Sequence, residues 1–192
     1  RAWLVARIRG EEPPEWTPPR AGALERCGGG RVGSTAVIPC YGVLSQRAGM
    51  LTEASGGTST EMMGRAVDDS ARDTTCSALV IDFDSSGGSV FGLTELHSQI
   101  MSAAAIKPVV GVANSLCASA AYWLASACSE VYVAPGGMIG SVGVLSAHED
   151  ISGALEEEGV KVTLVSAGEN KTAGNPYEPL SDSARAEMQA VV

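Results

Sequence analysis

Short apolar segments rich in β-branched residues alternate along this chain with longer segments in which apolar side chains recur every three or four residues. The first pattern is typical of buried strands and the second of amphipathic helices. Strands are therefore predicted at residues 35–44, 78–84, 108–114, 130–133 and 161–165. Helices are predicted at residues 60–72, 90–106 and 151–158, with a last one still running at residue 192.

This order of strands and helices predicts an α/β fold. Right-handed crossovers between successive strands produce a largely parallel sheet with helices outside. A glycine-rich hairpin is expected between residues 136 and 147. Residues 1–34 are rich in proline and glycine and are expected to form a loose arm or linker, which leaves one domain at residues 35–192.

One stretch combines a strand, a turn of small residues and a helix around a single serine, Ser119. Such a turn lifts the hydroxyl out of the backbone and aims the positive end of a helix at it, which favours an alkoxide or an oxyanion. The alternative is that Ser119 is only a helix N-cap, a position that serine commonly occupies.

A second candidate lies at Gly87-Gly88, just after the predicted strand 78–84. Sites in parallel sheets gather at the carboxyl ends of strands, and Ser119 also follows such an end. The backbone N–H groups of Gly88 and Ala120 are therefore candidate donors to an oxyanion. The alternative for the glycine pair is an ordinary turn between a strand and a helix.

Few residues can act as a base for Ser119. The chain has two histidines, His97 and His148, and three lysines. Lys107 and Lys161 lie at predicted strand starts, whereas Lys171 lies in a loop beyond the carboxyl end of a predicted strand. A lysine acts as a general base only when desolvation brings its pKa toward neutrality. The alternative is a solvated loop lysine.

Composition narrows the classes of function. The net charge of −9 and the pI of about 4.7, without any basic cluster, argue against nucleic acid or an anionic membrane surface as a partner. Five cysteines without a CxxC pair indicate reduced thiols rather than a disulfide framework or a zinc site. No apolar run reaches the roughly 20 residues that a membrane-spanning helix needs.

Three segments carry a resemblance to a known family: residues 118–123, 140–144 and 166–171. They resemble the signature segments of the signal peptide peptidase A family, serine–lysine endopeptidases of the Clp/crotonase fold. Residues 148–150 and 171–179 resemble its phage branch in particular, the capsid-assembly proteases. The likeness runs from about residue 35 to residue 192, and members of the family continue beyond that point.

The resemblance implies a role for each matching residue. Ser119 corresponds to the nucleophile, Lys171 to the general base and Ser141 to the serine that hydrogen-bonds the lysine. Gly88 and Ala120 correspond to the oxyanion donors. The family usually has a proline before the glycine pair, whereas this chain has Ser86, and a looser turn is expected because proline fixes φ.

The resemblance also implies a polypeptide substrate, no metal or organic cofactor, and a ring-shaped homo-oligomer. For the phage branch it implies cleavage of scaffold or capsid-related proteins in the cytoplasm or inside a prohead. The alternative role is degradation of cleaved signal peptides by a membrane-associated parent chain.

Three rival interpretations remain at this stage. A Ser-His-Asp triad would use His148 and Asp150, although two residues on one segment rarely converge as a triad requires. A crotonase-like enzyme acting on acyl-CoA thioesters would use the glycine pair without a Ser119–Lys171 dyad. A non-catalytic assembly subunit would keep only the fold.

Overall fold

The structure is a computed structural model that describes residues 22–47, 49, 56–168 and 170–192. It divides into two compact units, Arg1–Val142 and Gly143–Val192, which are described separately below. The described part of the predicted arm contains a short helix, α2 (Ala23–Arg26), and a strand, β1 (Gly30–Val32).

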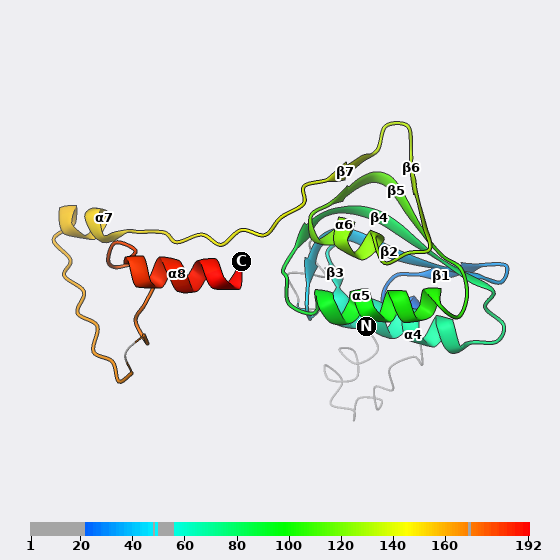
Figure 1. The fold of residues 1–192 in the computed structure, drawn as a ribbon, viewed down its shortest axis with the longest axis horizontal. Coiled ribbons are helices and arrows are strands. Elements are labelled where there is room, and N and C mark those ends of the chain that lie inside the picture. The colour runs from blue at the N-terminus through cyan, green and yellow to red at the C-terminus, as the bar shows by residue number, and fades with distance from the viewer. Residues whose placement is uncertain (1–21, 48, 50–55, 169) are drawn as a thin grey trace, which may run out of the picture. The chain divides into compact units, whose positions relative to one another are not determined.

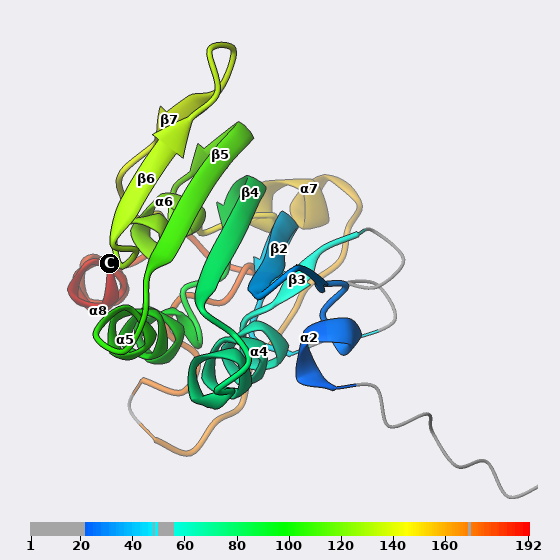
Figure 2. The ribbon, with the colours of Figure 1, turned by 90° about the vertical axis from the view of Figure 1, so that its right-hand side faces the viewer.

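The first unit is built on a mostly parallel sheet with the strand order β1-β2-β4-β5-β6 (Figures 1 and 2). Strands β2, β4, β5 and β6 run parallel to one another, and β1 pairs antiparallel with β2. The bounds of these strands are Thr35–Ser45 for β2, Ala78–Gly88 for β4, Val109–Ala118 for β5 and Glu130–Val133 for β6. The predicted α/β class with a largely parallel sheet is confirmed.

Helices cover one face of this sheet (Figure 1). They are α4 (Thr60–Arg72), α5 (Leu93–Ala104) and α6 (Ala120–Ala125), and a two-residue strand, β3 (Thr58–Ser59), precedes α4. Alternate residues of β2 and β4 are buried beneath the helices, as the period of two in a strand requires. The largest fully buried side chains are Phe83, Ile38, Leu44, Met63, Leu79, Ile81, Leu93, Leu96, Ile100, Leu124, Val67 and Val109.

Strand β5 pairs with two different strands on the same side. Its first half pairs with β6, and its last residues, Leu116 to Ala118, pair in parallel with β7 (Met138–Gly140). The prediction of a hairpin at residues 136–147 is therefore wrong. A glycine-rich apolar pattern predicts extended backbone, but it does not identify the partner, and here the partner is β5 rather than the following segment.

The second unit contains two helices, α7 (Ser152–Glu157) and α8 (Asp182–Val191), both close to their predicted positions. The His148 ring bonds to the Asn175 carbonyl at 2.9 Å, and the Ile151 N–H donates to the Pro176 carbonyl at 2.9 Å. These bonds connect the segment before α7 to the segment that precedes α8.

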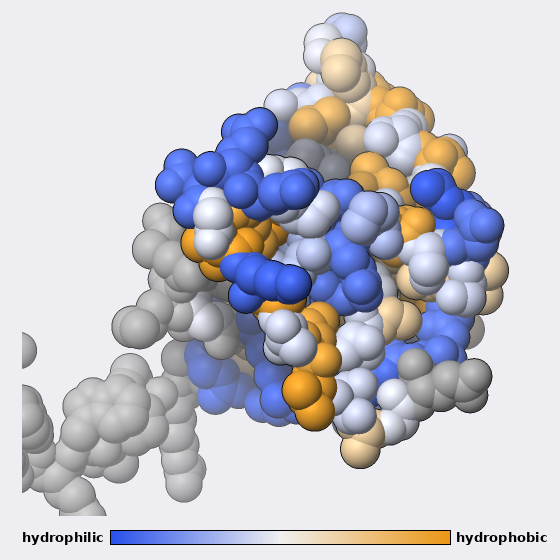
Figure 3. Space-filling model, turned by 90° about the vertical axis from the view of Figure 1, so that its left-hand side faces the viewer, coloured by the Kyte–Doolittle hydropathy of each residue, from blue (hydrophilic) through white to orange (hydrophobic). Residues whose placement is uncertain are grey.

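The predicted strand at residues 161–165 is wrong, because no strand of the described chain pairs with it. A strand needs a neighbour to satisfy its backbone groups, and an apolar pattern alone does not supply one. The apolar residues of this segment, Val162, Leu164 and Val165, are exposed. Apolar surface is visible among hydrophilic residues on the face drawn in Figure 3.

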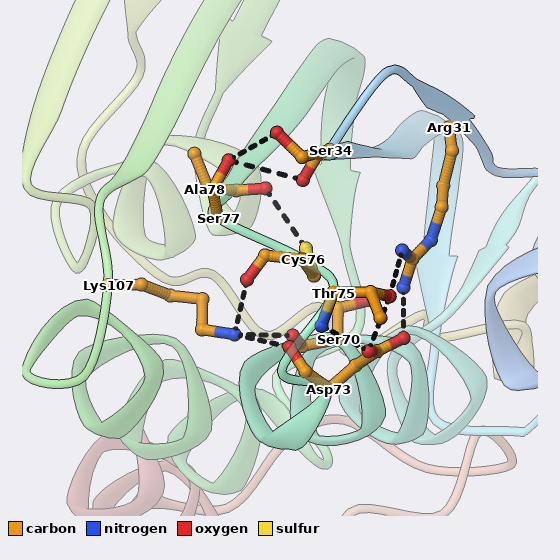
Figure 4. A network of polar contacts seen from close by, with 9 residues as sticks. All are labelled: Arg31, Ser34, Ser70, Asp73, Thr75, Cys76, Ser77, Ala78 and Lys107. Atoms are coloured by element: carbon orange, nitrogen blue, oxygen red, sulfur yellow. Dashed lines mark hydrogen bonds and ion pairs between the residues drawn. The ribbon is translucent and has the colours of Figure 1, made fainter.

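At the amino ends of the strands, Lys107 holds the loop between α4 and β4 (Figure 4). Its Nζ donates to three carbonyls, those of Ser70 at 3.1 Å, Asp73 at 2.9 Å and Cys76 at 2.7 Å. The end of a helix leaves carbonyls without intrahelical donors, and a cation there is favourable. Lys107 therefore has a structural role at the edge of the sheet opposite Ser119.

We expect Lys107→Met to lower the free energy of unfolding by about 1–3 kcal/mol, because the three carbonyls lose a charged donor while the aliphatic stem is kept. Urea denaturation of the full chain measures this change. Lys161→Met is the control, since Lys161 is exposed in the second unit. Equal stability of the two variants would contradict the structural role of Lys107.

Candidate active site

Ser119 forms a one-residue turn between two elements. Strand β5 ends at Ala118 and α6 begins at Ala120, so Ser119 alone joins them. Its φ of 53° and ψ of −120° are unfavourable for a residue with a Cβ. Strain of this kind concentrates at functional sites, and a sharp strand-to-helix turn presents the nucleophilic serine of the α/β-hydrolases.

The hydroxyl of Ser119 is not engaged in capping the helix that follows it. Ser119 occupies the N-cap position of α6, yet its side chain makes no capping hydrogen bond. The interpretation of Ser119 as a simple N-cap therefore lacks the bond that would define it. The side chain is half-buried, so its hydroxyl is partly shielded from water.

Backbone hydrogen bonds hold this turn on both sides. The Ser119 N–H donates to the Gly140 carbonyl at 2.8 Å, which continues the pairing of β5 with β7. The Ser119 carbonyl accepts from the Trp123 N–H at 3.0 Å. The strained conformation is thus fixed by the sheet before it and the helix after it.

Gly87 lies directly against the Ser119 turn. A Cβ placed on Gly87 would lie 2.8 Å from the Cβ of Ser119, 2.9 Å from the Ala118 carbonyl oxygen and 2.9 Å from the Ala120 nitrogen. Gly87 also has a φ of 95°, which residues with a side chain rarely adopt. Only glycine fits between the end of β4 and the turn.

The sequence predicts two oxyanion donors near Ser119, the backbone N–H groups of Ala120 and Gly88. Ala120 is the first residue of α6, and the first N–H groups of a helix have no intrahelical acceptor. Gly88 is paired with Leu44 of β2 in the register of the sheet. The donor to the Leu44 carbonyl, however, is the N–H of Ser89, at 2.9 Å. Pairing of β4 with β5 ends at Ser85 and Cys117, so the Gly88 N–H lies beyond that ladder.

Ser141 lies close to the Ser119 turn in the first unit. It directly follows Gly140, whose carbonyl accepts the Ser119 N–H. Ser119 and Ser141 are also the non-glycine residues of the described chain with positive φ, and Ser141 has a φ of 54°. The structure therefore brings together Gly88, Ser119, Ala120 and Ser141 at the carboxyl edge of the sheet.

Lys171 belongs to the second unit, where it lies in a series of turns and is exposed. Its N–H donates to the Gly168 carbonyl at 3.3 Å. The pairing of Lys171 with Ser119 stays a prediction, since each unit is described by itself.

The histidines have other contacts. His97 of α5 packs against Trp123 of α6, with ring centroids 5.9 Å apart. The Asp150 carboxylate accepts from the Ser152 N–H and hydroxyl, at 2.9 and 2.6 Å, while His148 bonds to Asn175. Asp150 therefore does not orient His148 as a triad would require.

Cys117 lies two residues before Ser119 but is a poor nucleophile. Burial raises the pKa of its thiol to about 11. The thiol therefore stays protonated at neutral pH, and the thiolate is the reactive form of cysteine. Ser119 is the stronger candidate at this turn.

Comparison with known proteins gives the family. Residues 102–192 match the model described as Peptidase family S49. The chain is 36% identical over 155 residues to the capsid assembly protease C of Escherichia phage lambda, covering 81% of this chain and 35% of that protein. It is 34% identical over 158 residues to the head-tail preconnector protein GP5 of Enterobacteria phage P21, covering 82% of this chain and 32% of that protein.

The chain thus spans about a third of the length of these relatives. Among solved structures, a probable enoyl-CoA hydratase from Mycobacterium smegmatis aligns with 58% of this chain and 49% of its own, at 14% identity and a TM-score of 0.44. In the described part of the chain, no helix has the length and apolar character needed to cross a membrane.

The match to the family model contains Ser119, Ser141 and Lys171, the residues to which the resemblance assigns the nucleophile, the lysine-orienting serine and the general base. The pattern predicts a strand only to residue 84 and does not single out Ser85, which the structure buries within β4. On the family match and the two phage relatives together, this chain carries a domain of peptidase family S49.

Proposed function

We propose that this chain is a serine endopeptidase in which Ser119 is the nucleophile and Lys171 is the general base. The observation that supports it best is the strained turn at Ser119, whose hydroxyl is not engaged in capping and lies beside backbone N–H donors. A nucleophile, a base and oxyanion donors are the parts that acyl transfer needs.

The proposed reaction proceeds in two halves. The uncharged Lys171 amine removes the Ser119 proton, and the Ser119 oxygen attacks the peptide carbonyl. The N–H groups of Gly88 and Ala120 donate to the oxyanion, and the Lys171 ammonium then protonates the leaving amine. Water, deprotonated by the same amine, hydrolyses the acyl-enzyme and restores Ser119.

In this proposal Ser141 donates or accepts a hydrogen bond at the Lys171 amine. A hydroxyl is suited to that position because it orients the amine without adding a charge, whereas a carboxylate would favour the ammonium form. Lys171 is exposed in its own unit, so the proposal requires that its amine becomes desolvated on reaching Ser119, within one chain or from a neighbouring copy.

The proposed substrate is a scaffold or capsid-related polypeptide, cleaved in the cytoplasm or within a prohead by a ring-shaped homo-oligomer. Support comes from the two phage relatives, one named a capsid assembly protease and the other a head-tail preconnector protein. Degradation of signal peptides by a membrane-associated parent chain is the alternative role, and a non-catalytic assembly subunit is the alternative outside enzymes.

We expect a fluorophosphonate probe to label the wild-type chain on Ser119, because the activated serine oxygen attacks phosphorus as it attacks a carbonyl. Ser119→Ala should abolish the labelling, and Lys171→Ala should slow it on the order of 100-fold or more. Mass spectrometry of the labelled peptide locates the adduct. Labelling of another residue, or labelling indifferent to Lys171, would exclude the dyad, and lack of any labelling would favour the crotonase-like or non-catalytic alternative.

The pH dependence of hydrolysis distinguishes Lys171 from His148 as the base. Only an uncharged amine accepts a proton, so with Lys171 the value of kcat/KM should keep rising from pH 7 into the alkaline range. With a histidine base it would level off above about pH 7, because histidine is already neutral there. Initial rates of peptide hydrolysis between pH 5 and pH 10 measure the profile, and a plateau at neutral pH would contradict the proposal.

We expect Gly87→Ala to lower kcat/KM on the order of 100-fold or more, since its methyl group collides with the Ser119 turn and its backbone has positive φ. Gly136→Ala is the matched control, because a Cβ there meets nothing within 4 Å. Peptide hydrolysis and the midpoint of thermal unfolding are measured for both variants. Activity of folded Gly87→Ala equal to that of Gly136→Ala would show that the close approach is not needed.

A further inference from the structure

Ser85 is a polar residue among the alternate positions of β4 that are buried. The preceding buried positions are Leu79, Ile81 and Phe83, and Ser85 itself is only 1% exposed. Burial of a hydroxyl is unfavourable unless it is hydrogen-bonded. Its contacts therefore indicate why a serine lies at this position.

The Ser85 hydroxyl connects two irregular parts of the sheet. Its Oγ donates to the Gly42 carbonyl of β2 at 2.5 Å and accepts from the Gly87 N–H at 3.1 Å. The register of β2 against β4 shifts between Tyr41 and Val43, and that of β4 against β5 shifts before Ser85. Regular ladder bonds are interrupted where the register shifts, and the Ser85 hydroxyl satisfies two backbone groups there.

These bonds fix the backbone that leads to the candidate oxyanion donor. The Gly87 N–H is engaged by Ser85 and is not free for a substrate, which leaves Gly88 as the donor from this turn. Gly87 also contacts the Ser119 turn, so its position determines where Gly88 lies relative to the nucleophile. Ser86 is exposed, and as a non-proline residue it does not itself fix φ.

We propose that Ser85 is a positioning residue that holds the Gly87–Gly88 backbone in place, so that the Gly88 N–H donates to the oxyanion formed at Ser119. The inference rests on the proposed function, since it assigns the turn to oxyanion binding. Ser85 touches neither substrate nor reacting atoms and acts through the Gly87 N–H and the Gly42 carbonyl.

Loss of the hydroxyl should affect the transition state more than the bound substrate, because the negative charge on oxygen develops only during attack. We expect Ser85→Ala to lower kcat about 10- to 100-fold while KM changes by less than about threefold, since removal of one oxyanion donor outright costs about 100- to 1000-fold. Ser85→Cys, which is nearly isosteric and bonds more weakly, should lose about tenfold. Ser86→Ala is the control and should keep wild-type kcat, because its side chain is exposed.

The experiment uses the full chain with a fluorogenic peptide that has an aliphatic residue before the cleaved bond, and active sites are counted with a fluorophosphonate. A peptide boronate of the same sequence forms a tetrahedral adduct on serine, so its affinity should fall by the same factor as kcat/KM. Binding of the uncleaved peptide, measured in the Ser119→Ala background, should stay unchanged when Ser85→Ala is added.

Wild-type kcat in a folded Ser85→Ala or Ser85→Cys variant would overturn the role of Ser85, and so would an equal loss in boronate affinity and in binding of uncleaved peptide. Thermal unfolding of each variant identifies the folded ones, and Ser85→Cys serves where Ser85→Ala does not fold. If the wild-type chain is not labelled on Ser119, the proposed function fails, and with it this inference. If the wild-type chain is labelled on Ser119 but the Ser85 variants keep wild-type kcat, only the inference about Ser85 fails and the proposed function stands.

Discussion

The close approach of the β4 backbone to the turn at Ser119 is the constraint on which the site depends. A side chain at Gly87 would collide with Ala118, Ser119 and Ala120, so β4 can approach the turn this closely only with glycine at that position. The turn itself is strained and persists because β7 holds its N–H and α6 holds its carbonyl. Protein backbones keep such strained conformations only where the surrounding structure over-determines them.

The two edges of the sheet serve different purposes. At the amino edge, Lys107 binds three carbonyls of the loop that joins α4 to β4. At the carboxyl edge, chain irregularities gather: the register shifts of β2 and β4, the positive φ values of Ser119 and Ser141, and the buried Ser85 hydroxyl. Regular ladders stabilise the middle of the sheet, and departures from them shape the candidate site.

Much of the first unit follows from its apolar pattern. The predicted strand at residues 130–133 agrees with β6, and the positions of Ser119 and Gly88 at the carboxyl edge follow from the parallel arrangement. The apolar pattern gave wrong predictions where the structure of a segment depends on which strand it pairs with. Residues 138–140 pair with β5 instead of forming a hairpin, and residues 161–165 have no strand partner in the described chain. Periodicity describes one segment, whereas a strand also needs a neighbour.

The role of Ser85 was missed for a related reason. Glycine and serine residues after an apolar run are typical of a turn, so the pattern predicts a strand that ends at residue 84, whereas β4 continues to Gly88. Extending the alternation of Leu79, Ile81 and Phe83 by one step would have placed Ser85 in the core. The pairing of Ser119 with Lys171 stays a prediction, because the two residues belong to different units, each described by itself.

The distance along β4 and β5 between the Lys107 network and the Ser119 turn has a practical consequence. Changes at sites without shared contacts combine almost additively. Laboratory evolution toward heat resistance can therefore act on the loop before β4 with little effect on the candidate site at the turn after β5, and substitutions at that turn should leave the Lys107 network intact.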